Sequence, residues 1–595
     1  MLYENQTSLG VPTQKGFYLT TAMADHALSW LRAHRSQSPS QPFFLYFATG
    51  ASHAPHHVPK EWADRYKGAF DGGWDALREA TFARQKNLGV IPQDAMLTKR
   101  PDAFPAWAPL SPELKKLYAR QMEVYAGFQE ATDHEVGRVL DGIASLGLSD
   151  NTLVVYIFGD NGASLEGTET GTINELTALN GIPLTAAQQL EALKAYGGLA
   201  EWGGRRTDPH YAAAWALAGN TPFQWGKQVA SHLGGTRNGM VVAWPRRIKD
   251  KGGLRSQFTH AIDLTPTILE VAGIPAPTKV NGVEQMPMHG TSFAYSFDDA
   301  KARERHTQQY FEIIGNRAMY KDGWMWSCRI DRVPWKLDPK TMARLAPGQW
   351  NPEDDQCALY DLTRDFSQST DVAAKHPEKM RELESLFWSE AARYQVLPLL
   401  GGLAFAWGIQ PPGSGDRRQI VLYPGVQNIP QGSIPPIQNR SFSITADLEL
   451  PRNMCVASVC KGADGVIVAN GSFLGGFALY VEGGRPRYTY SFLGLKVDDL
   501  VGKESMPEGK VTLRYEFKAD QPGKLATGGT QRLLVNGRQV AAGKLEHTVP
   551  LRFSAYAGLD VGRDNGLPVS PGKLYYLRAP FPFEGVIKRV VFDIE

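Results

Sequence analysis

The hydrophobic pattern of this chain changes near residue 410, and the change divides the sequence into two parts of different fold class. Up to about residue 400, helical stretches alternate with short apolar runs that lead into Gly- or Asp-rich turns. This alternation is typical of an α/β domain with a largely parallel sheet. Further along, apolar and polar residues alternate one by one, as they do in half-buried strands. We therefore expect an α/β domain over 1–405, a linker over 406–418 and an all-β domain over 419–595.

Four apolar runs in the first part have the length and composition of buried strands. They are rich in β-branched and aromatic residues and too short for ordinary helices. The runs are 42–47, 152–158, 239–244 and 309–314. A helix is expected over 111–146, because Ser111 and Pro112 suit its first two positions. A second helix is expected over 263–272, which Gly273 closes.

The second part has the pattern of a β-sandwich or jelly roll. Apolar residues occupy every second position over 442–450 and again over 511–517. Asn536-Gly537 lies between two short apolar runs, which is a strong hairpin signal. Many short strands at even spacing indicate two packed antiparallel sheets.

Composition excludes several classes of function. The formal net charge of +2 gives no reason to expect a nucleic-acid or acidic-lipid partner. The longest apolar stretch, 396–409, is interrupted by Pro398 and two glycines and is shorter than the roughly 20 residues of a membrane span. The four cysteines are too few for a disulfide scaffold and contain no Cys-x-x-Cys pair of the zinc or redox kind.

Polar residues that suit a metal ion or an anion follow or precede the expected strands. Asp160 and Asn161 come directly after one strand, and their oxygens are ligands of the kind that Ca²⁺ and Mg²⁺ prefer, although Asp-Asn-Gly is also an ordinary turn sequence. Lys227 precedes a glycine-rich turn, 234–237, that leads into another strand and could hold a tetrahedral anion.

Three histidines, His53, His56 and His57, lie on a proline-stiffened loop after the run 42–47. Such imidazoles can exchange protons with an ester, bind a transition metal or simply lie on the surface. The residue types alone leave these three alternatives open.

Six segments occur together in an order that resembles the sulfatase family of the alkaline-phosphatase-like superfamily, particularly the large bacterial arylsulfatases. They are Pro42–Ala48, His53–Pro59, Phe70–Arg78, Phe158–Gly162, Gly234–Arg237 and Asp263–Leu269. The tail, with Gly475–Tyr480 and Leu559–Asp564, looks like the concanavalin-like sandwich that some of these enzymes carry.

The resemblance implies a sulfuric ester hydrolase that splits a sulfate monoester into an alcohol or phenol and sulfate. One divalent cation, Ca²⁺ or Mg²⁺, and a formylglycine nucleophile are expected in the family. Asp160 and Asn161 match two metal ligands, His56 matches the catalytic histidine near the leaving oxygen, and Lys227 matches the sulfate-binding lysine. His57 is the alternative to His56, and His232 near Lys227 is a further substrate-binding candidate.

The chain departs from the family pattern at the nucleophile. Neither the Cys/Ser-x-Pro/Ala-x-Arg motif nor the Asp-Asp pair of the first strand is present where the family has them. The literal match at Ser389–Arg393 falls in an amphipathic helix and is interpreted as helix surface. We expect that the chain begins inside the family's fold, lacks the nucleophile, part of the metal site and any signal peptide, and can itself be inactive.

Two other functions compete with this interpretation. A phosphoesterase of the same superfamily could use the same polar residues, and a non-catalytic protein could bind glycans through the sandwich. The expected partner is a small-molecule or glycan sulfate ester, with no nucleic acid and no membrane span. The sequence predicts neither an oligomeric state nor a compartment.

Overall fold

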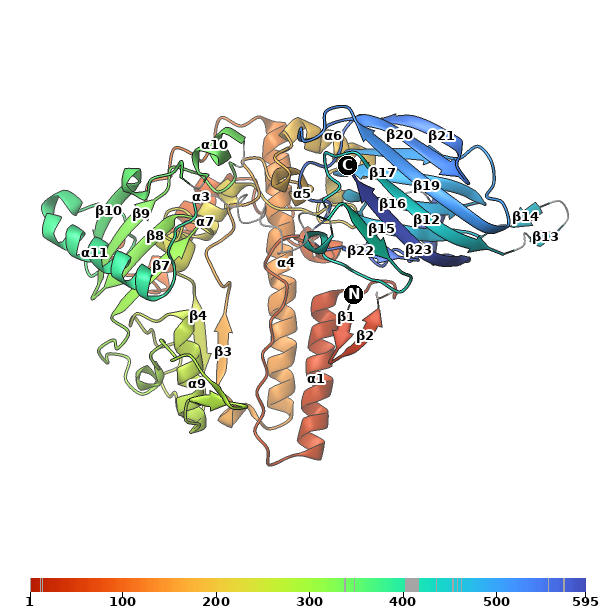
Figure 1. Ribbon diagram of the computed structural model, residues 1–595. Coiled ribbons are helices and arrows are strands. Elements are labelled where there is room, and N and C mark those ends of the chain that lie inside the picture. Colours follow the sequence, from red (N-terminus) through yellow and green to blue (C-terminus); the bar gives the residue numbers. More distant parts are fainter. Residues whose placement is uncertain are drawn as a thin grey trace.

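The computed structural model describes an α/β part and a β-sandwich, which lie on opposite sides of Figure 1. The described residues are 2–10, 12, 14–336, 339–346, 348–401, 417–434, 436–451, 454–456, 459–461, 463–554, 556–570 and 573–595. Most of the expected linker, 406–416, lies outside them. The two expected fold classes therefore occur in the expected order along the chain.

A long helix, α4 (Pro112–Ser145), runs through the middle of the molecule and organises the α/β part (Figure 1). The Ser111 hydroxyl accepts a hydrogen bond from the Leu114 N–H at 3.3 Å, which caps the helix start where the sequence predicted it. Alongside α4 lies α1 (Leu19–Gln37), and the two helices share a small apolar core. The helix α9 (Leu264–Ala272) ends at Gly273, whose φ of +67° is left-handed, so both predicted helices are confirmed.

The strands of the α/β part pair differently from the expectation. β3 (Val154–Ile157) pairs with β4 (Met240–Ala243) in antiparallel orientation. A separate antiparallel sheet has the order β10-β9-β8-β7. Its strands are β7 (Gln308–Ile313), β8 (Asn316–Lys321), β9 (Trp324–Arg329) and β10 (Gln356–Asp361). The prediction of a largely parallel sheet is therefore wrong for the described residues, because every strand pair among them is antiparallel.

The run 42–47 is extended but forms no strand. Phe43, Leu45 and Phe47 pack on the core between α1 and α4. The residues between them, Phe44 and Tyr46, are 70% and 82% exposed. No described strand lies beside this run to bond its backbone. The prediction of a buried strand here is wrong, because a run can follow the period of a strand without having a neighbour to pair with.

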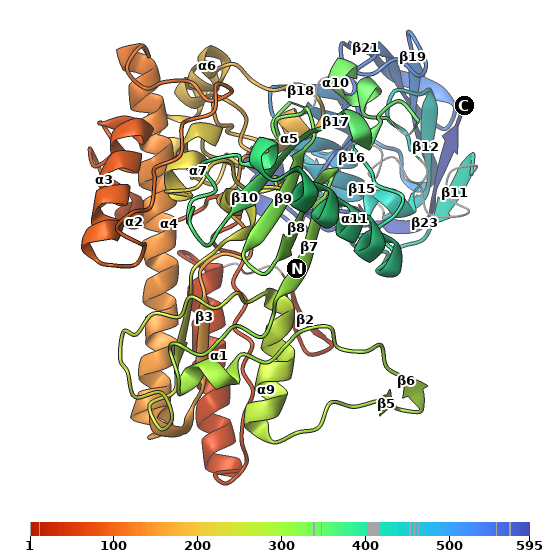
Figure 2. The ribbon, with the colours of Figure 1, turned by 90° about the vertical axis from the view of Figure 1, so that its left-hand side faces the viewer.

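The remaining α-helices and strands of the α/β part vary in length. They are β1 (Leu2–Glu4), β2 (Thr7–Gly10), α2 (Lys60–Asp64), α3 (Gly73–Asn87), α5 (Glu175–Leu179), α6 (Ala186–Tyr196), α7 (Ala213–Gly219), α8 (Leu233–Thr236), β5 (Lys279–Val280), β6 (Val283–Glu284), α10 (Pro339–Arg344) and α11 (Pro377–Arg393). The helix α11 buries Leu383 and Phe387 against the four-stranded sheet (Figure 2). Ser389 on the same helix is exposed, which confirms its interpretation as helix surface.

One disulfide bond reinforces the four-stranded sheet. It joins Cys328 of β9 to Cys357 of β10, which are directly opposite each other in the antiparallel register. The Cys328 side chain is fully buried, and it packs with Trp326 and Phe387 in the core beneath α11. The cysteine count did not predict this bond.

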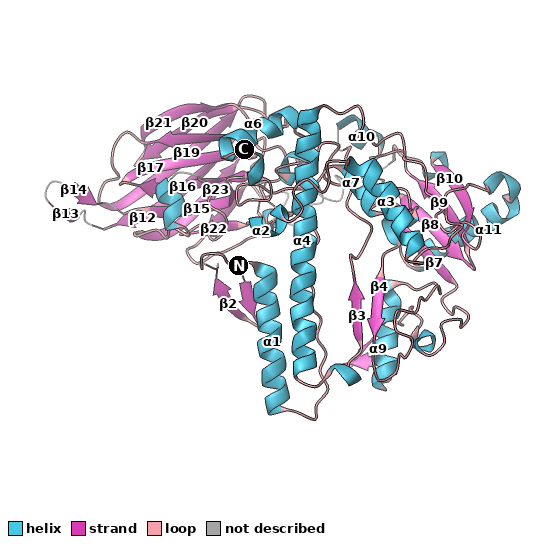
Figure 3. Ribbon diagram, turned by 180° about the vertical axis from the view of Figure 1, so that it is seen from behind, coloured by secondary structure: helices cyan, strands magenta, loops and turns pink. Residues whose placement is uncertain are grey.

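The C-terminal part is a sandwich of two antiparallel sheets, and Figure 3 shows it built almost entirely of strands. The first sheet contains, in order, β11 (Gln419–Leu422), β23 (Val586–Ile594), β12 (Phe442–Leu450), β19 (Gly509–Ala519), β20 (Gly529–Val535) and β21 (Arg538–Leu545). The second contains β18 (Lys496–Val501), β17 (Arg485–Phe492), β16 (Gly475–Glu482), β15 (Gly465–Ser472) and β22 (Leu559–Val561). A hairpin of β13 (Met454–Val456) and β14 (Val459–Lys461) and the short α13 (Lys573–Arg578) complete this part.

The alternating pattern predicted the core of the sandwich. Ile444 and Leu448 of β12 face the same core as Leu513 of β19 and Phe477 of β16, and all four side chains are buried. Asn536 and Gly537 turn the β20–β21 hairpin with φ angles of +48° and +79°, as the two-residue turn requires. The predicted sandwich and this hairpin are confirmed.

A short segment around α5 docks the α/β part onto the sandwich. Leu176 is buried in the apolar core of the sandwich. The Asn174 side chain donates hydrogen bonds to the carbonyl oxygens of Leu474 and Leu493, at 3.1 and 2.9 Å. Asn180 accepts hydrogen bonds from the backbone N–H groups of 551 and 552, at 2.8 and 2.9 Å. Buried side-chain bonds of this kind fix the relative position of the two parts.

None of the helices in the described part of the chain is long and apolar enough to cross a membrane.

Candidate active site

The antiparallel pairing of β3 and β4 brings two of the predicted polar segments together. The turn at 160–162 follows β3, and the glycine-rich turn at 234–237 precedes β4, so both lie at the same end of the pair. The Gly162 N–H donates to the Gly235 carbonyl at 3.0 Å. A Cβ at Gly162 would lie 1.7 Å from the Gly234 oxygen, so this close approach requires glycine.

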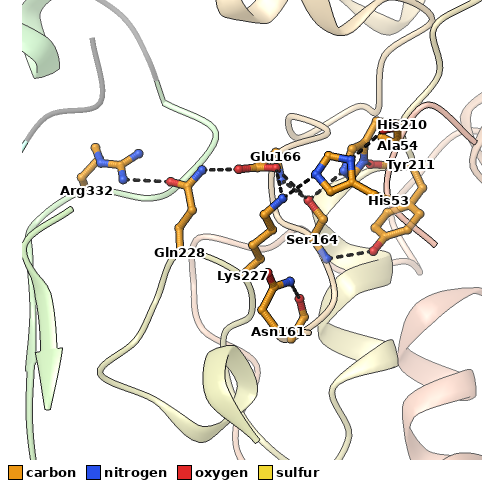
Figure 4. A network of polar contacts seen from close by, with 11 residues as sticks. His53, Ala54, Asn161, Ser164, Glu166, His210, Tyr211, Lys227, Gln228 and Arg332 are labelled. Atoms are coloured by element: carbon orange, nitrogen blue, oxygen red, sulfur yellow. Dashed lines mark hydrogen bonds and ion pairs between the residues drawn. The ribbon is translucent and has the colours of Figure 1, made fainter. Parts of the chain in front are cut away.

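Lys227 is at the centre of a network of polar contacts (Figure 4). Its ammonium group lies 2.8 Å from a carboxylate oxygen of Glu166 and 2.9 Å from Nε2 of His53. An ammonium group has three N–H donors, and these two partners use two of them. The Lys227 side chain is 17% exposed, so the third donor can reach a ligand. The predicted anion-binding lysine thus keeps one N–H that no described residue uses.

His53 is the histidine that touches Lys227, although the sequence favoured His56. Its Nδ1 lies 2.7 Å from the Ala54 carbonyl oxygen, which can only accept a hydrogen bond. The proton of the neutral ring is therefore on Nδ1, and Nε2 accepts a hydrogen bond from the ammonium of Lys227. His53 is exposed, so this lone pair lies at the surface of the site.

Glu166 fixes the position of Lys227, and no sequence motif had pointed to it. Burial alone would raise the pKa of the Glu166 carboxyl, but the charge of Lys227 and hydrogen bonds from Lys227 and Gln228 outweigh it and lower the pKa. Gln228 donates to Glu166 at 2.6 Å and accepts from Arg332 at 3.0 Å (Figure 4). Glu166 is therefore ionised at neutral pH and balances the charge of Lys227.

A serine–histidine pair lies beside this ion pair. The Ser164 hydroxyl is 2.8 Å from Nε2 of His210, whose Nδ1 donates to the Tyr211 carbonyl at 2.9 Å. The geometry is that of a nucleophile and its base. However, burial of His210 lowers its pKa to about 4, which makes the ring a weak base at neutral pH. We infer that His210 positions the loop at Ser164 rather than activating the hydroxyl.

His56 lies underneath the site rather than in it. The side chain is 1% exposed, and its ring packs against Tyr125, Tyr211 and His210 at centroid distances of 4.8 to 5.0 Å. Burial, followed by the neighbouring histidines, keeps the pKa of His56 well below its ordinary value. The ring is therefore neutral and separated from solvent. Its role as the catalytic histidine stays a prediction that rests on the resemblance alone.

The other two candidate histidines also bond within the protein. His57 lies 2.7 Å from the Thr207 carbonyl oxygen, and its pKa is lowered chiefly by burial. His232 is 7% exposed and bonds to the Ser231 hydroxyl at 2.9 Å. Burial and the charge of Arg329 lower the pKa of His232 to about 3. The structure thus brings together Lys227 and His53 but places neither of these rings against them.

Asp160 and Asn161 supply oxygen ligands of the kind that a hard cation binds, but too few of them. Asp160 is exposed, and the Asn161 amide donates to the Gly162 carbonyl at 3.0 Å, so its oxygen is not used by any described residue. Ca²⁺ takes about 6–8 oxygen ligands, and Mg²⁺ takes about six. Within the described residues, no three His, Cys, Asp or Glu side chains gather as a metal site. The described residues therefore do not form a complete cation site.

Comparison with known proteins places this network in a family. The sulfatase family model matches residues 1–274. An uncharacterized sulfatase of Schizosaccharomyces pombe is 30% identical over 379 residues, which are 62% of this chain and 60% of that protein. An arylsulfatase of Klebsiella aerogenes is 28% identical over 293 residues, which are 49% of this chain and 58% of that protein. Over residues 1–274 the chain belongs to the sulfatase family.

The chain spans about three fifths of the length of these two relatives. Among solved structures, the putative sulfatase yidJ from Bacteroides fragilis is 16% identical with a TM-score of 0.34, covering 63% of this chain and 58% of that chain. The structure of Ps i-CgsB is 16% identical with a TM-score of 0.38, covering 67% of this chain and 60% of that chain.

Proposed function

We propose that this chain binds sulfate monoesters as a sulfuric ester hydrolase, with the sulfate group at Lys227. The single observation that carries the proposal is the Lys227 ammonium, which Glu166 and His53 hold with one donor free, inside a domain of the sulfatase family. The free N–H would donate to a sulfate oxygen, while His53 Nε2 accepts from the same ammonium group and holds it in place. Hydrogen bonds that involve a charged group are the stronger ones, so this donor would anchor the ester.

The charge of the site favours a sulfate over a phosphate ester. A sulfate monoester carries one negative charge, whereas a phosphate monoester carries close to two above about pH 6. Lys227 already shares its charge with the ionised Glu166, and His53 is neutral in its hydrogen-bonded state. A second negative charge on the ligand would lie near the Glu166 carboxylate without a matching cation.

The nucleophile is the part of the reaction for which the described residues offer no fitting group. Ser164 faces a weak base, and Ser389 lies on the outer surface of α11. The formylglycine that the family uses has no matching Cys or Ser motif here, so no step is derived through it. The proposal therefore assigns sulfate-ester binding to Lys227 and His53 and assigns the nucleophile to no described residue.

Paired ligands test this proposal. The full chain is titrated calorimetrically with 4-nitrophenyl sulfate and 4-nitrophenyl phosphate at about pH 8, while release of 4-nitrophenol is followed in parallel. We expect the sulfate to bind about tenfold more tightly than the phosphate, or about 1.4 kcal/mol. Equal or tighter binding of the phosphate, or faster release from it, would overturn the proposal in favour of a phosphoesterase.

A further inference from the structure

A buried arginine lies behind the ion pair of Lys227 and Glu166. Arg332 follows β9 in the chain, and it is 4% exposed. Its guanidinium group donates to the side-chain oxygen of Gln228 at 3.0 Å and to the Pro334 carbonyl oxygen at 3.2 Å. Within the described residues, no carboxylate forms an ion pair or a hydrogen bond with this guanidinium. A buried cation is costly unless a negative charge compensates it.

Gln228 connects Arg332 to the carboxylate that holds Lys227. The amide nitrogen of Gln228 donates to Glu166 at 2.6 Å, while its oxygen accepts from Arg332 (Figure 4). The amide is therefore oriented by an anion at one end and a cation at the other. Burial lowers the pKa of Arg332 to about 10, and the charge of Glu166 acts against that change. Arg332 is thus charged at neutral pH, and Glu166 is its compensating charge.

The backbone of Gln228 is fixed as firmly as its side chain. Its φ of +73° lies in the left-handed region, which is unfavourable for a residue other than glycine. Asn316 of β8, which is 1% exposed, donates from its side-chain amide to the Gln228 carbonyl oxygen at 2.9 Å. Such a conformation persists where surrounding contacts hold it, and it often marks a functional site. Because Lys227 is the preceding residue, these contacts also fix where the Lys227 side chain begins.

The charges of this network do not balance within the protein. We propose that Arg332 is a positioning residue of the sulfate site, which acts on Glu166 through Gln228 and gives the site one net positive charge. Lys227 and Arg332 contribute two positive charges, Glu166 contributes one negative charge, and His53 is neutral. Without Arg332, Glu166 would neutralise Lys227 and the site would attract an anion more weakly. The inference rests on the proposed sulfate site and adds the residue that sets its charge.

Calorimetric titration of the full chain with 4-nitrophenyl sulfate at neutral pH tests this role. Arg332→Met and Arg332→Lys both replace the arginine by an unbranched side chain, but only the lysine keeps the charge. We expect Arg332→Met to weaken binding about tenfold and Arg332→Lys to bind within about threefold of wild type. Gln228→Met removes the link and is expected to weaken binding about fivefold. Combining Gln228→Met with Arg332→Met should cost less than the product of the two effects, because both act along one path.

The matched control is Arg329→Met, three residues earlier in the chain. The Arg329 guanidinium lies 4.8 Å from the centre of the Trp225 ring and donates to the side chain of Gln356 rather than to Gln228. This variant is expected to bind the sulfate ester as wild type does. The Tm of each variant is measured in parallel, so that affinities are compared among folded chains.

The outcomes separate the role of Arg332 from the sulfate site itself. If Arg332→Met binds as tightly as wild type, or Arg332→Lys binds no more tightly than Arg332→Met, the inference is overturned and the sulfate site stands. If Arg332→Met does not fold, Gln228→Met decides, and an unchanged affinity in that variant overturns the inference. If wild-type binding does not depend on Lys227, the proposed function fails and the role of Arg332 fails with it.

Discussion

Replacing Lys227 with alanine is expected to weaken sulfate binding by about 10- to 100-fold. The side chain donates to Glu166 and His53 and has one N–H left for the anion. A hydrogen bond to a charged group contributes about 1.5–3 kcal/mol, which corresponds to that range of affinity. The affinity for inorganic sulfate is measured by calorimetry with the full chain. An unchanged affinity in the variant would place the anion elsewhere.

Two further variants separate lost binding from lost folding. Lys227→Ala leaves the partly buried Glu166 carboxylate without its cation, which destabilises the loop. The double variant Lys227→Met with Glu166→Gln removes both charges and is expected to stay folded without binding sulfate. Lys194→Ala, which alters an exposed lysine paired with Glu191 on α6, is the matched control and should bind sulfate normally.

Replacing Glu175 with glutamine is expected to raise the Tm at about pH 8 by about 5 °C and to have almost no effect at about pH 4. The pKa of Glu175 is raised to about 8 in the folded chain, against about 4.3 in an unfolded one. Between these values the folded state binds more protons than the unfolded state, so the free energy of unfolding falls as pH rises. The contribution of Glu175 to the free energy of unfolding is therefore largest below about pH 4. It falls as the pH rises above that value and is lost once the pH has passed about 8.

The variant must be compared with the wild type at each pH, because other groups titrate in the same range. Buried histidines such as His210, with its pKa lowered to about 4, act in the opposite direction. A lowered histidine pKa makes the fold gain stability as pH rises toward about 6.5. Asp208, with its pKa raised to about 6, adds a loss between about pH 4 and 6. The histidine contributions cancel in the difference between Glu175→Gln and wild type, whereas the part of the Asp208 contribution that comes from its interaction with Glu175 remains in it.

Differential scanning calorimetry at several pH values measures the Tm difference between Glu175→Gln and wild type directly. The exposed Glu191 on α6 offers a matched control, and Glu191→Gln is expected to shift the Tm equally little at every pH. A difference between Glu175→Gln and wild type that stays constant from about pH 4 to 8 would mean that Glu175 is solvated and paired.

Local sequence signals predicted the elements whose structure depends on neighbouring residues. Ser111 and Pro112 marked the start of α4, because a cap and a preset φ act within one helical turn. Asn536-Gly537 marked the β20–β21 hairpin, because the two-residue turn needs positive φ angles. The period-two pattern over 442–450 corresponds residue for residue to β12.

Pairing between distant segments was not predictable from the same signals. The run 42–47 has the composition of a buried strand, but composition does not say whether a neighbouring strand exists. Likewise, β3 and β4 have apolar sequences that fit either a parallel or an antiparallel pair. Their direction follows from the path of the chain between them, which hydrophobic periodicity does not contain.

The site was predicted in part for the same reason. The sequence pointed to Lys227 and to the loop of three histidines, but the contact between Lys227 and His53 joins residues 174 positions apart. Only the fold decides which ring of that loop points outward. Glu166 belongs to no motif, so nothing in the sequence marked the partner of the lysine.

A crystal of the full chain grown with selenate, the heavier analogue of sulfate, tests the sulfate site most directly. Anomalous diffraction locates selenium without reference to the protein. The account predicts a selenate oxygen at about 2.7–3.2 Å from the Lys227 Nζ, close to His53 and on the accessible side of the ion pair with Glu166. Selenate bound only at other positions, with Lys227 still bonded to Glu166 and His53 alone, would contradict it.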